Sequence, residues 1–438
     1  MCIKNANYLN IYVQYNYIME SYNPWWVGEI DPLYEEWLNS RVKWIPSIIE
    51  KISSKPYALN FLIGPRQVGK TTALKIYIYK LLKKRDPRSI FYYSCDEIVD
   101  HRELGEILDN YISMRNAWRI KSSVIILDEI TFVGEWHRAL KSRIDRGEFR
   151  RDVLIITGSA SIELLAGKER FPGRRGSGKD LYMYPLSFQD YVRHLTSIEL
   201  KPSTLENWEE YRKCVEANKV FSHKLEEMFI YYLKTGGFPI PIREYFETGR
   251  ITYVSYKTYL DWLKTDWLKT GRDEGYMKEV LTYLLEASPT PLSWHNIAKN
   301  TSLLSPHTAR EYIETLEALM VLKIIYWASP DGKINYRKNK KMLFIDPFIY
   351  NVLSKYTRVK VDEATIVEAT VTTHFSRRYR TYYWHNSTEI DAILMTDKKP
   401  LAFEIKWTRK PRTGRKPIKT YILDREKIPI FLATLKIT

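Results

Sequence analysis

The stretch Gly64 to Thr71 of this 438-residue chain fits the phosphate-binding pattern G-x-x-x-x-G-K-[ST]. An apolar run at 57–63 is typical of a buried strand, and the residues after Thr71 have leucine and isoleucine at helical spacing. The two glycines allow successive N–H groups to point at phosphate oxygens, and the helix start adds positive potential. Lys70 supplies a cation for the β- and γ-phosphates, and the Thr71 hydroxyl would hold Mg²⁺. The pattern predicts a nucleoside triphosphate site.

Two carboxylates follow a second predicted strand. The apolar run at 124–127 ends in Asp128 and Glu129. Asp128 would complete the Mg²⁺ shell, and Glu129 would orient or deprotonate the attacking water. The alternative is a surface strand end with two solvated acids. The pair predicts hydrolysis as well as binding.

Two further strands, at 89–94 and 152–157, fit the same sheet. Ser159 follows the second of them and is the candidate sensor of the γ-phosphate, with Thr157 as the alternative. The basic loop at 167–176 comes next. Its arginines are candidates for a finger that acts in cis or on a neighbouring subunit, and the alternatives are a solvated loop or a nucleic-acid contact. These candidates are Arg170, Arg174 and Arg175.

Together, several motifs resemble the archaeal ATPase family, a branch of the AAA+-like P-loop proteins that carries a winged helix and a restriction-endonuclease-like C-terminal domain. The resemblance covers nearly the whole chain after about Asn23. The motifs are G-P-R-Q-V-G-K-T-T (64–72), L-D-E-I (127–130), W-H-R-A-L-K (136–141), T-G-S-A-S (157–161), F-P-G-R-R-G (171–176), Y-P-L-S-F (184–188) and G-G-F-P (236–239).

The resemblance implies ATP and Mg²⁺ as cofactors. It implies catalytic roles for Glu129, Lys70 and Arg174, of which Arg174 occupies the family's G-R position. Thr71 and Asp128 would hold Mg²⁺. The implied nucleotide contacts are Gly64, Pro65, Arg66, Gln67, Val68, Gly69, Lys70, Thr71, Thr72 and Ser159.

The expected fold class is α/β, with a P-loop AAA+-like parallel sheet as the first domain. Helix-end and turn residues, together with the resemblance, divide the remaining sequence into further parts. The expected parts are an N-terminal extension at 1–22, the P-loop core at 23–195, a helical lid at 196–250, a connector helix with a winged helix-turn-helix at 251–340, and a restriction-endonuclease-like α/β domain at 341–438. Met19 is an alternative start to Met1.

The winged-helix segment and the C-terminal segment both suggest DNA. Ser305 as N-cap and Pro306 begin the third helix of the winged helix, whose outward side chains would face a groove or, alternatively, a protein. Asp391, Glu404 and Lys406 form D-x12-E-x-K, which is similar to the PD-(D/E)xK nuclease core.

In that nuclease core two carboxylates hold Mg²⁺ and the lysine stabilises hydroxide. Glu368 occupies the position of an extra acid, and Ile390 replaces the motif's proline. A hairpin with exposed alternating charges, or an inactivated nuclease fold, is the alternative.

Composition agrees with a cytoplasmic nucleic-acid protein. The formal charge of +16 favours a polyanionic partner, although an acidic membrane surface or solubility alone gives the same charge. The three cysteines form no C-x-x-C pair, and no apolar run reaches membrane-spanning length.

The sequence therefore predicts an enzyme, an ATPase coupled to DNA, with Mg²⁺-dependent cleavage as a second activity of the C-terminal domain. The alternative is a nucleotide-dependent switch that binds protein partners, with a silent nuclease fold. A homo-oligomer is compatible with both.

Overall fold

The computed structural model describes residues 19–158, 161–386, 388–397, 399–409, 411 and 414–437. Most of the predicted N-terminal extension, and Ser159, lie outside these residues. The chain forms two compact units, which divide between Met183 and Tyr184. This division falls earlier than the predicted boundary at residue 195, so the helix that follows Ser187 belongs to the second unit.

The first unit is built on a five-stranded sheet with the order β2-β3-β4-β1-β5, in which every pair of neighbouring strands is parallel. This arrangement confirms the predicted parallel α/β sheet. Because all of its strands run in one direction, the loops after the carboxyl ends of β1, β3 and β4 lie along one edge. The strands are β1 (Ala58–Ile63), β2 (Ile90–Ser94), β3 (Val124–Asp128), β4 (Val153–Thr157) and β5 (Asp180–Tyr182).

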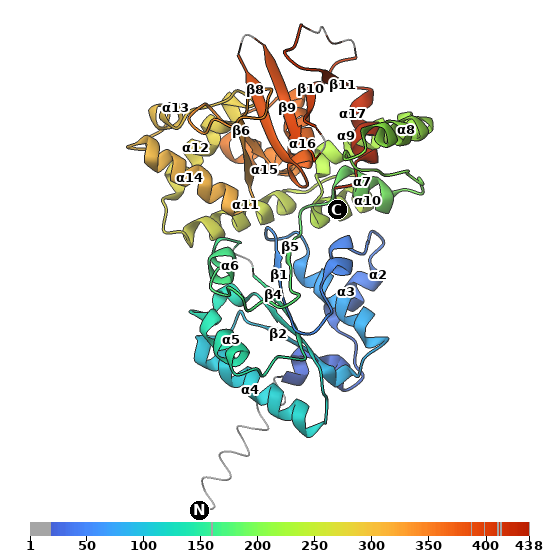
Figure 1. The fold of residues 1–438 in the computed structure, drawn as a ribbon, viewed down its shortest axis with the longest axis vertical. Helices are drawn as coiled ribbons and strands as arrows, with labels where there is room; N and C mark the ends of the chain where they lie inside the picture. The colour runs from blue at the N-terminus through green and yellow to red at the C-terminus, as the bar shows by residue number, and fades with distance from the viewer. Residues whose placement is uncertain are drawn as a thin grey trace, which may run out of the picture. The chain divides into compact units, whose positions relative to one another are not determined.

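Helices cover this sheet (Figure 1). The predicted strand, loop and helix around Gly64 are confirmed, because β1 is buried along its whole length and α3 begins at Lys70. The helices are α2 (Pro32–Asn39), α3 (Lys70–Leu82), α4 (His101–Ala117), α5 (Trp136–Asp145) and α6 (Ser161–Lys168), with the 3-10 turns η1 (Pro24–Trp26), η2 (Ser47–Lys51), η3 (Pro87–Ser89) and η4 (Ile130–Phe132).

The segment before α2 is anchored to strand β2. The Asn23 side chain accepts a hydrogen bond from Tyr92 N at 2.7 Å and donates one to Tyr92 O at 2.9 Å. The indole nitrogens of Trp25 and Trp26 both donate to Ile90 O. These contacts pack both tryptophans against the core of this unit.

The second unit holds a mixed six-stranded sheet with the order β11-β10-β9-β8-β6-β7. Its strands are β6 (Leu322–Trp327), β7 (Lys341–Phe344), β8 (Arg380–His385), β9 (Glu389–Met395), β10 (Leu401–Lys406) and β11 (Thr420–Asp424). Its helices are α7 (Phe188–Leu195), α8 (Trp208–Asn218), α9 (Ser222–Thr235), α10 (Pro239–Thr248), α11 (Tyr253–Leu268), α12 (Glu274–Ala287), α13 (Trp294–Lys299), α14 (Pro306–Ala318), α15 (Pro347–Thr357), α16 (Glu363–Ser376) and α17 (Lys427–Thr434), with the turn η5 (Lys219–Phe221).

Two predicted segments share this unit with the C-terminal strands. The helices at 196–250, predicted as a lid, pack against α15 and α17, for example through the Tyr211 hydroxyl, which donates to Phe431 O at 2.6 Å. Strand β6 of the predicted winged helix pairs with both β7 and β8, so one sheet crosses the predicted boundary at residue 340. Ser305 is the N-cap of α14, which confirms the prediction, and Ser293 caps α13.

The G-G-F-P motif at 236–239 brings three parts of this unit together. Gly237 N donates to Asp346 Oδ2 at 2.8 Å, and Gly237 O accepts from Leu186 N at 2.8 Å. A Cβ on Gly237 would lie 2.2 Å from Leu186 O and 2.5 Å from Leu186 N. Because both atoms belong to the backbone, they cannot move aside as a flexible side chain would.

We expect Gly237→Ala to lower the free energy of unfolding of this unit by about 3 kcal/mol, the upper part of the range for overpacking. Calorimetry of the full chain should show a lower Tm. Gly414→Ala is the control, because an added Cβ there has no atom within 4 Å. Equal Tm values for the two variants would contradict this account of the motif.

None of the helices among the described residues is long and apolar enough to cross a membrane. Cys95 and Cys214 are free thiols.

Candidate functional site

The loop between β1 and α3 carries the predicted phosphate contacts. Gly69 has a φ of 94°, a left-handed conformation that glycine adopts easily and that turns the chain into α3. A Cβ on Gly64 would lie 2.4 Å from the carbonyl oxygen of Met183, so only glycine fits against the end of β5. Lys70 Nζ donates to Gly64 O and Pro65 O, both at 2.9 Å. The loop therefore holds a buried ammonium group beside its own N–H groups.

Asp128 meets this loop at the end of β3. The Thr71 side chain hydrogen-bonds to the Asp128 carboxylate, and the Tyr92 hydroxyl donates to Asp128 Oδ2 at 3.0 Å. Burial raises the pKa of Asp128 and the charge of Glu129 raises it further, while the bonds from Thr71 and Tyr92 and the charge of Lys70 oppose this shift. The structure thus brings together two oxygen groups predicted to hold Mg²⁺. Hydroxyl and carboxylate oxygens suit that ion.

Glu129 directly follows, in an unusual backbone conformation. Its φ of 53° is left-handed, which is uncommon for a residue with a side chain, and its N–H donates to Asp128 Oδ1 at 3.0 Å. Its Oε2 atom is buried and has no hydrogen-bond partner among the described residues. Because an unpaired buried carboxylate oxygen is unfavourable, this atom suits a position that contacts a water molecule or a ligand.

Two threonines extend this edge of the sheet. The hydroxyls of Thr157, at the end of β4, and of Thr131 are buried and lack hydrogen-bond partners within the described part of the chain. A Cβ on Gly158 would lie 2.6 Å from Thr131 Cγ2, so the ends of β3 and β4 are in close contact. The preferred sensor, Ser159, lies outside the described residues, and its role stays a prediction, as does that of Thr157.

The N-terminal segment supports Asp128 through Tyr92. The Lys75 ammonium, on α3, lies 3.4 Å from the centre of the Tyr92 ring and 2.8 Å from Asp31 Oδ2. Burial lowers the pKa of Lys75, and the hydrogen bond to Asp31 opposes this shift. With Asn23 bonded to the Tyr92 backbone, this contact fixes the hydroxyl that donates to Asp128. Neither Tyr92 nor Lys75 belongs to a motif, so sequence reasoning missed both.

Arg174 lies at the other end of β1. Leu59 N donates to Arg175 O at 3.0 Å, and the Tyr57 hydroxyl donates to Arg174 O. These contacts are at the amino end of β1, whereas the phosphate loop follows its carboxyl end, about 20 Å away at the usual rise per residue. Arg174 therefore does not fit a finger that acts in cis, because its side chain cannot span the sheet.

The arginines of this loop have acidic partners of their own. Arg174 Nε donates to Asp145 Oδ1 at 2.6 Å, and Arg175 Nη2 to Asp180 Oδ1 at 2.5 Å. An Arg174 contact with a neighbouring subunit stays a prediction.

The predicted nuclease-like residues lie close together in the second unit. Continuing the antiparallel register of β9 and β10 places Asp391 opposite Glu404. Asp391 Oδ2 accepts a hydrogen bond from Ile405 N at 2.7 Å. Lys406 Nζ lies 3.5 Å from Glu404 Oε1. The Glu368 carboxylate forms an ion pair with Lys341, in which Oε1 lies 2.7 Å from Nζ. Sequence reasoning missed Lys341, although a lysine at the start of an apolar strand was a visible signal.

A comparison with family models decides the class of the first unit. A model described as an AAA domain matches residues 57–192, which include the phosphate loop, Asp128 and Glu129. Residues 57–192 are an AAA-type P-loop ATPase domain. A second model, described as a domain of unknown function (DUF8612), matches residues 226–360. The AAA domain match and the parallel strand order agree with each other.

An archaeal protein is similar to part of the chain. The uncharacterized protein MJ1637 of Methanocaldococcus jannaschii is 28% identical over 325 residues, which are 70% of this chain and 64% of the relative. More than a third of that relative is therefore not matched.

Two solved structures are similar in part. The Walker-type ATPase PABY2304 of Pyrococcus abyssi has 13% identity and a TM-score of 0.42, over 67% of this chain and 90% of its own. The ORC2 protein of Aeropyrum pernix has 11% identity and a TM-score of 0.36, over 76% and 96%. With such low scores, the assignment of the AAA domain rests on the family match and the strand order.

Proposed function

We propose that this protein binds and hydrolyses ATP at the AAA domain in a Mg²⁺-dependent reaction. The observation that carries the proposal is the contact of Thr71 with Asp128 beside Lys70, at the edge where Glu129 keeps a buried oxygen without a partner among the described residues. These four side chains have the chemistry that phosphoryl transfer to water needs.

Each side chain has a distinct role in this reaction. Lys70 exchanges its bonds to Gly64 O and Pro65 O for bonds to phosphate oxygens, which the N–H groups of the loop also bind. Thr71 and Asp128 would hold Mg²⁺, whose charge would stabilise negative charge on the phosphates. Glu129 orients the attacking water and accepts its proton.

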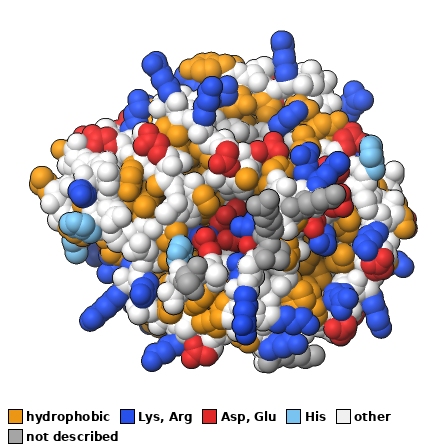
Figure 2. Space-filling model, turned by 90° about the horizontal axis from the view of Figure 1, so that it is seen from above, with side chains coloured by type: hydrophobic (Ala, Val, Ile, Leu, Met, Phe, Trp, Pro, Cys, Tyr) orange, Lys and Arg blue, Asp and Glu red, His pale blue; other side chains and the backbone are white. Residues whose placement is uncertain are grey.

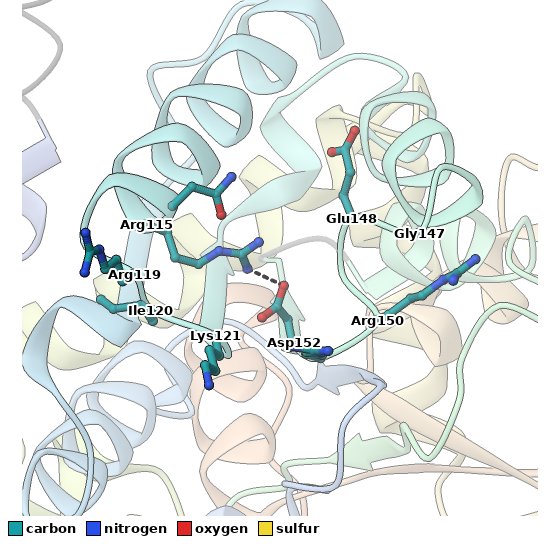
Figure 3. A pocket seen from close by; sticks show the side chains of 10 residues that line it. Arg115, Arg119, Ile120, Lys121, Gly147, Glu148, Arg150 and Asp152 are labelled. Atoms are coloured by element: carbon teal, nitrogen blue, oxygen red, sulfur yellow. Dashed lines mark hydrogen bonds and ion pairs between the residues drawn. The ribbon is translucent and has the colours of Figure 1, made fainter.

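We further propose that the ATPase is coupled to DNA through a basic pocket on the same unit. The pocket has a volume of about 440 Å³ and lies beside the amino ends of β3 and β4, with Arg115, Arg119, Lys121, Arg150 and Arg151 in its lining. In Figure 3, Arg115 and Asp152 point toward each other, Arg119 and Lys121 lie on one side, and Arg150 on the other.

The charges of this pocket favour a phosphate backbone. Asp152 is neutralised by Arg115, whose Nη1 lies 2.5 Å from Asp152 Oδ2, and Glu148 is paired with Arg146. Arg119, Lys121 and Arg150 are exposed and form no ion pair with the acidic side chains that the structure describes. The Nε of Arg115 is buried and lacks a hydrogen-bond partner in the same part of the chain. Unpaired cations around a cavity attract phosphates.

The third helix of the predicted winged helix is a weaker candidate for this contact. Its basic side chains have acidic partners nearby. The pairs are His307 with Glu311 at 3.6 Å and Arg310 with Glu314 at 2.7 Å, and Lys323, which follows the helix on β6, pairs with Glu317 at 2.7 Å. We therefore assign the DNA contact to the pocket of the first unit.

The test is steady-state ATP hydrolysis with and without single-stranded, duplex and branched DNA. We expect one DNA form to stimulate the wild type, and Arg119→Glu with Arg150→Glu to remove that stimulation while basal turnover stays within about twofold, because the pocket lies at the opposite edge of the sheet from the phosphate loop. Arg138→Glu, an exposed arginine paired with Glu135, is the matched control. Turnover that ignores every DNA form would contradict the coupling and favour a switch that binds protein partners.

A further inference from the structure

Lys341 is the centre of a buried charge cluster in the second unit. It begins β7, and only 1% of its side chain is exposed. Its Nζ lies 2.7 Å from Glu368 Oε1, 2.7 Å from Glu389 Oε1 and 3.6 Å from Asp391 Oδ1. Three carboxylates from α16 and β9 thus converge on one ammonium group.

The remaining acid of the predicted metal site is also paired with lysines. Glu404 lies next to Asp391 across the strand pair, and its Oε2 is 3.1 Å from Lys416 Nζ. Lys416 also donates to Glu389 O at 2.6 Å. Every carboxylate that would hold Mg²⁺ in a PD-(D/E)xK site therefore already contacts a cation of the chain itself.

Acidic and basic side chains also lie close together on the surface (Figure 2). Figure 2 shows Asp and Glu side chains gathered near the middle of the face in view, with Lys and Arg side chains around them. Within the described residues, no group of three or more His, Cys, Asp or Glu side chains is arranged to hold a metal ion.

The electrostatics of the cluster explain why Lys341 stays in place. The carboxylates of Glu368, Glu389 and Asp391 lie within 3.6 Å of the Lys341 ammonium and offset the cost of burying its charge. A divalent ion that entered would meet this ammonium, because β7 holds Lys341 beside the same carboxylates. Displacing it would leave a buried cation without its partners, which is strongly unfavourable.

We propose that Lys341 is the resident cation of this site and takes the place that a divalent metal has in a nuclease of this type. The acids are then structural partners of a lysine, and the second unit does not cleave DNA by a metal-dependent reaction. This inference stands apart from the ATPase, because it concerns the other unit.

The test measures Mn²⁺ binding to nucleotide-free, full-length protein by electron paramagnetic resonance of the free ion. All variants carry Asp128→Asn, which removes the candidate metal ligand of the AAA domain. We expect this background to bind as much Mn²⁺ as the same background with Asp391→Asn added. Adding Lys341→Ala should create one Mn²⁺ site per chain, and Mn²⁺ at 100 times its Kd should then raise the Tm by roughly 5–10 °C.

The matched control is Lys340→Ala, which removes a neighbouring lysine that is also buried but lies 4.8 Å from the centre of the Trp294 ring. It should create no Mn²⁺ site. The gain in the Lys341→Ala protein should vanish when Asp391→Asn is added. If Lys341→Ala does not fold without metal, the inference is still tested by comparing Mn²⁺ binding in the Asp128→Asn background with and without Asp391→Asn.

Three results would overturn the inference. One is Mn²⁺ binding in the background that Asp391→Asn removes, and another is Mn²⁺-dependent DNA cleavage that Asp391→Ala or Glu404→Ala abolishes. The third is a folded Lys341→Ala protein that binds no Mn²⁺, because the carboxylates would then be unable to hold a metal even without the lysine.

Discussion

Lys70→Ala should reduce ATP turnover by at least about 100-fold, the usual effect of removing one preorganised charge from a transition state. The Lys70 ammonium is buried beside Gly64 O and Pro65 O, and alanine cannot replace its contact with the phosphates. Steady-state phosphate release with saturating Mg²⁺ and ATP measures the loss. Binding of a fluorescent ATP analogue shows whether affinity falls as well.

Lys80→Ala is the matched control for this change, because Lys80 lies on the same helix but is exposed and paired with Glu50. Its turnover should equal that of the wild type. Near-normal turnover in a pure, folded Lys70→Ala preparation would remove the basis for placing ATP at this loop.

Glu129→Gln should separate binding from hydrolysis. We expect kcat to fall by about 100- to 1,000-fold, because glutamine cannot accept the proton of the attacking water, while ATP affinity stays within a few-fold. The neutral side chain also removes the negative charge that raises the pKa of Asp128, so the Mg²⁺ ligand is not weakened. Single-turnover kinetics and analogue binding, measured on the same preparation, give the two quantities.

Glu135→Gln provides the comparison, because Glu135 is also a left-handed residue that precedes a helix but pairs with Arg138 at the surface. It should change kcat little. An equal loss of ATP binding and turnover in Glu129→Gln would mean that Glu129 shapes the site and does not act on water.

The nuclease-like site shows which contacts a sequence motif can predict and which it cannot. The spacing of Asp391, Glu404 and Lys406 correctly places the acids beside each other, since it depends on two adjacent strands joined by a short turn. The partner that changes their chemistry, Lys341, is 50 residues from Asp391 and comes from a strand that does not pair with either of theirs. A local pattern contains no information about such a neighbour.

The strand order also decided where the arginines of the loop at 171–176 lie. F-P-G-R-R-G follows the sensor strand in the sequence, yet its contacts with Tyr57 and Leu59 bring it to the amino edge of the sheet. The basic pocket is likewise made from two segments, 115–121 and 147–152, that meet only because β3 and β4 are neighbours.

By itself the sequence determined the phosphate loop, the Asp128 and Glu129 pair and the strands that carry them, because glycine conformation, apolar runs and strand-end acids act over a few adjacent residues. Only the tertiary structure decided which edge of the sheet Arg174 occupies, that Tyr92 and Asn23 support Asp128, and that Lys341 neutralises the C-terminal acids. The physical reason is that the partner of a buried charge is set by strand order and packing between distant segments.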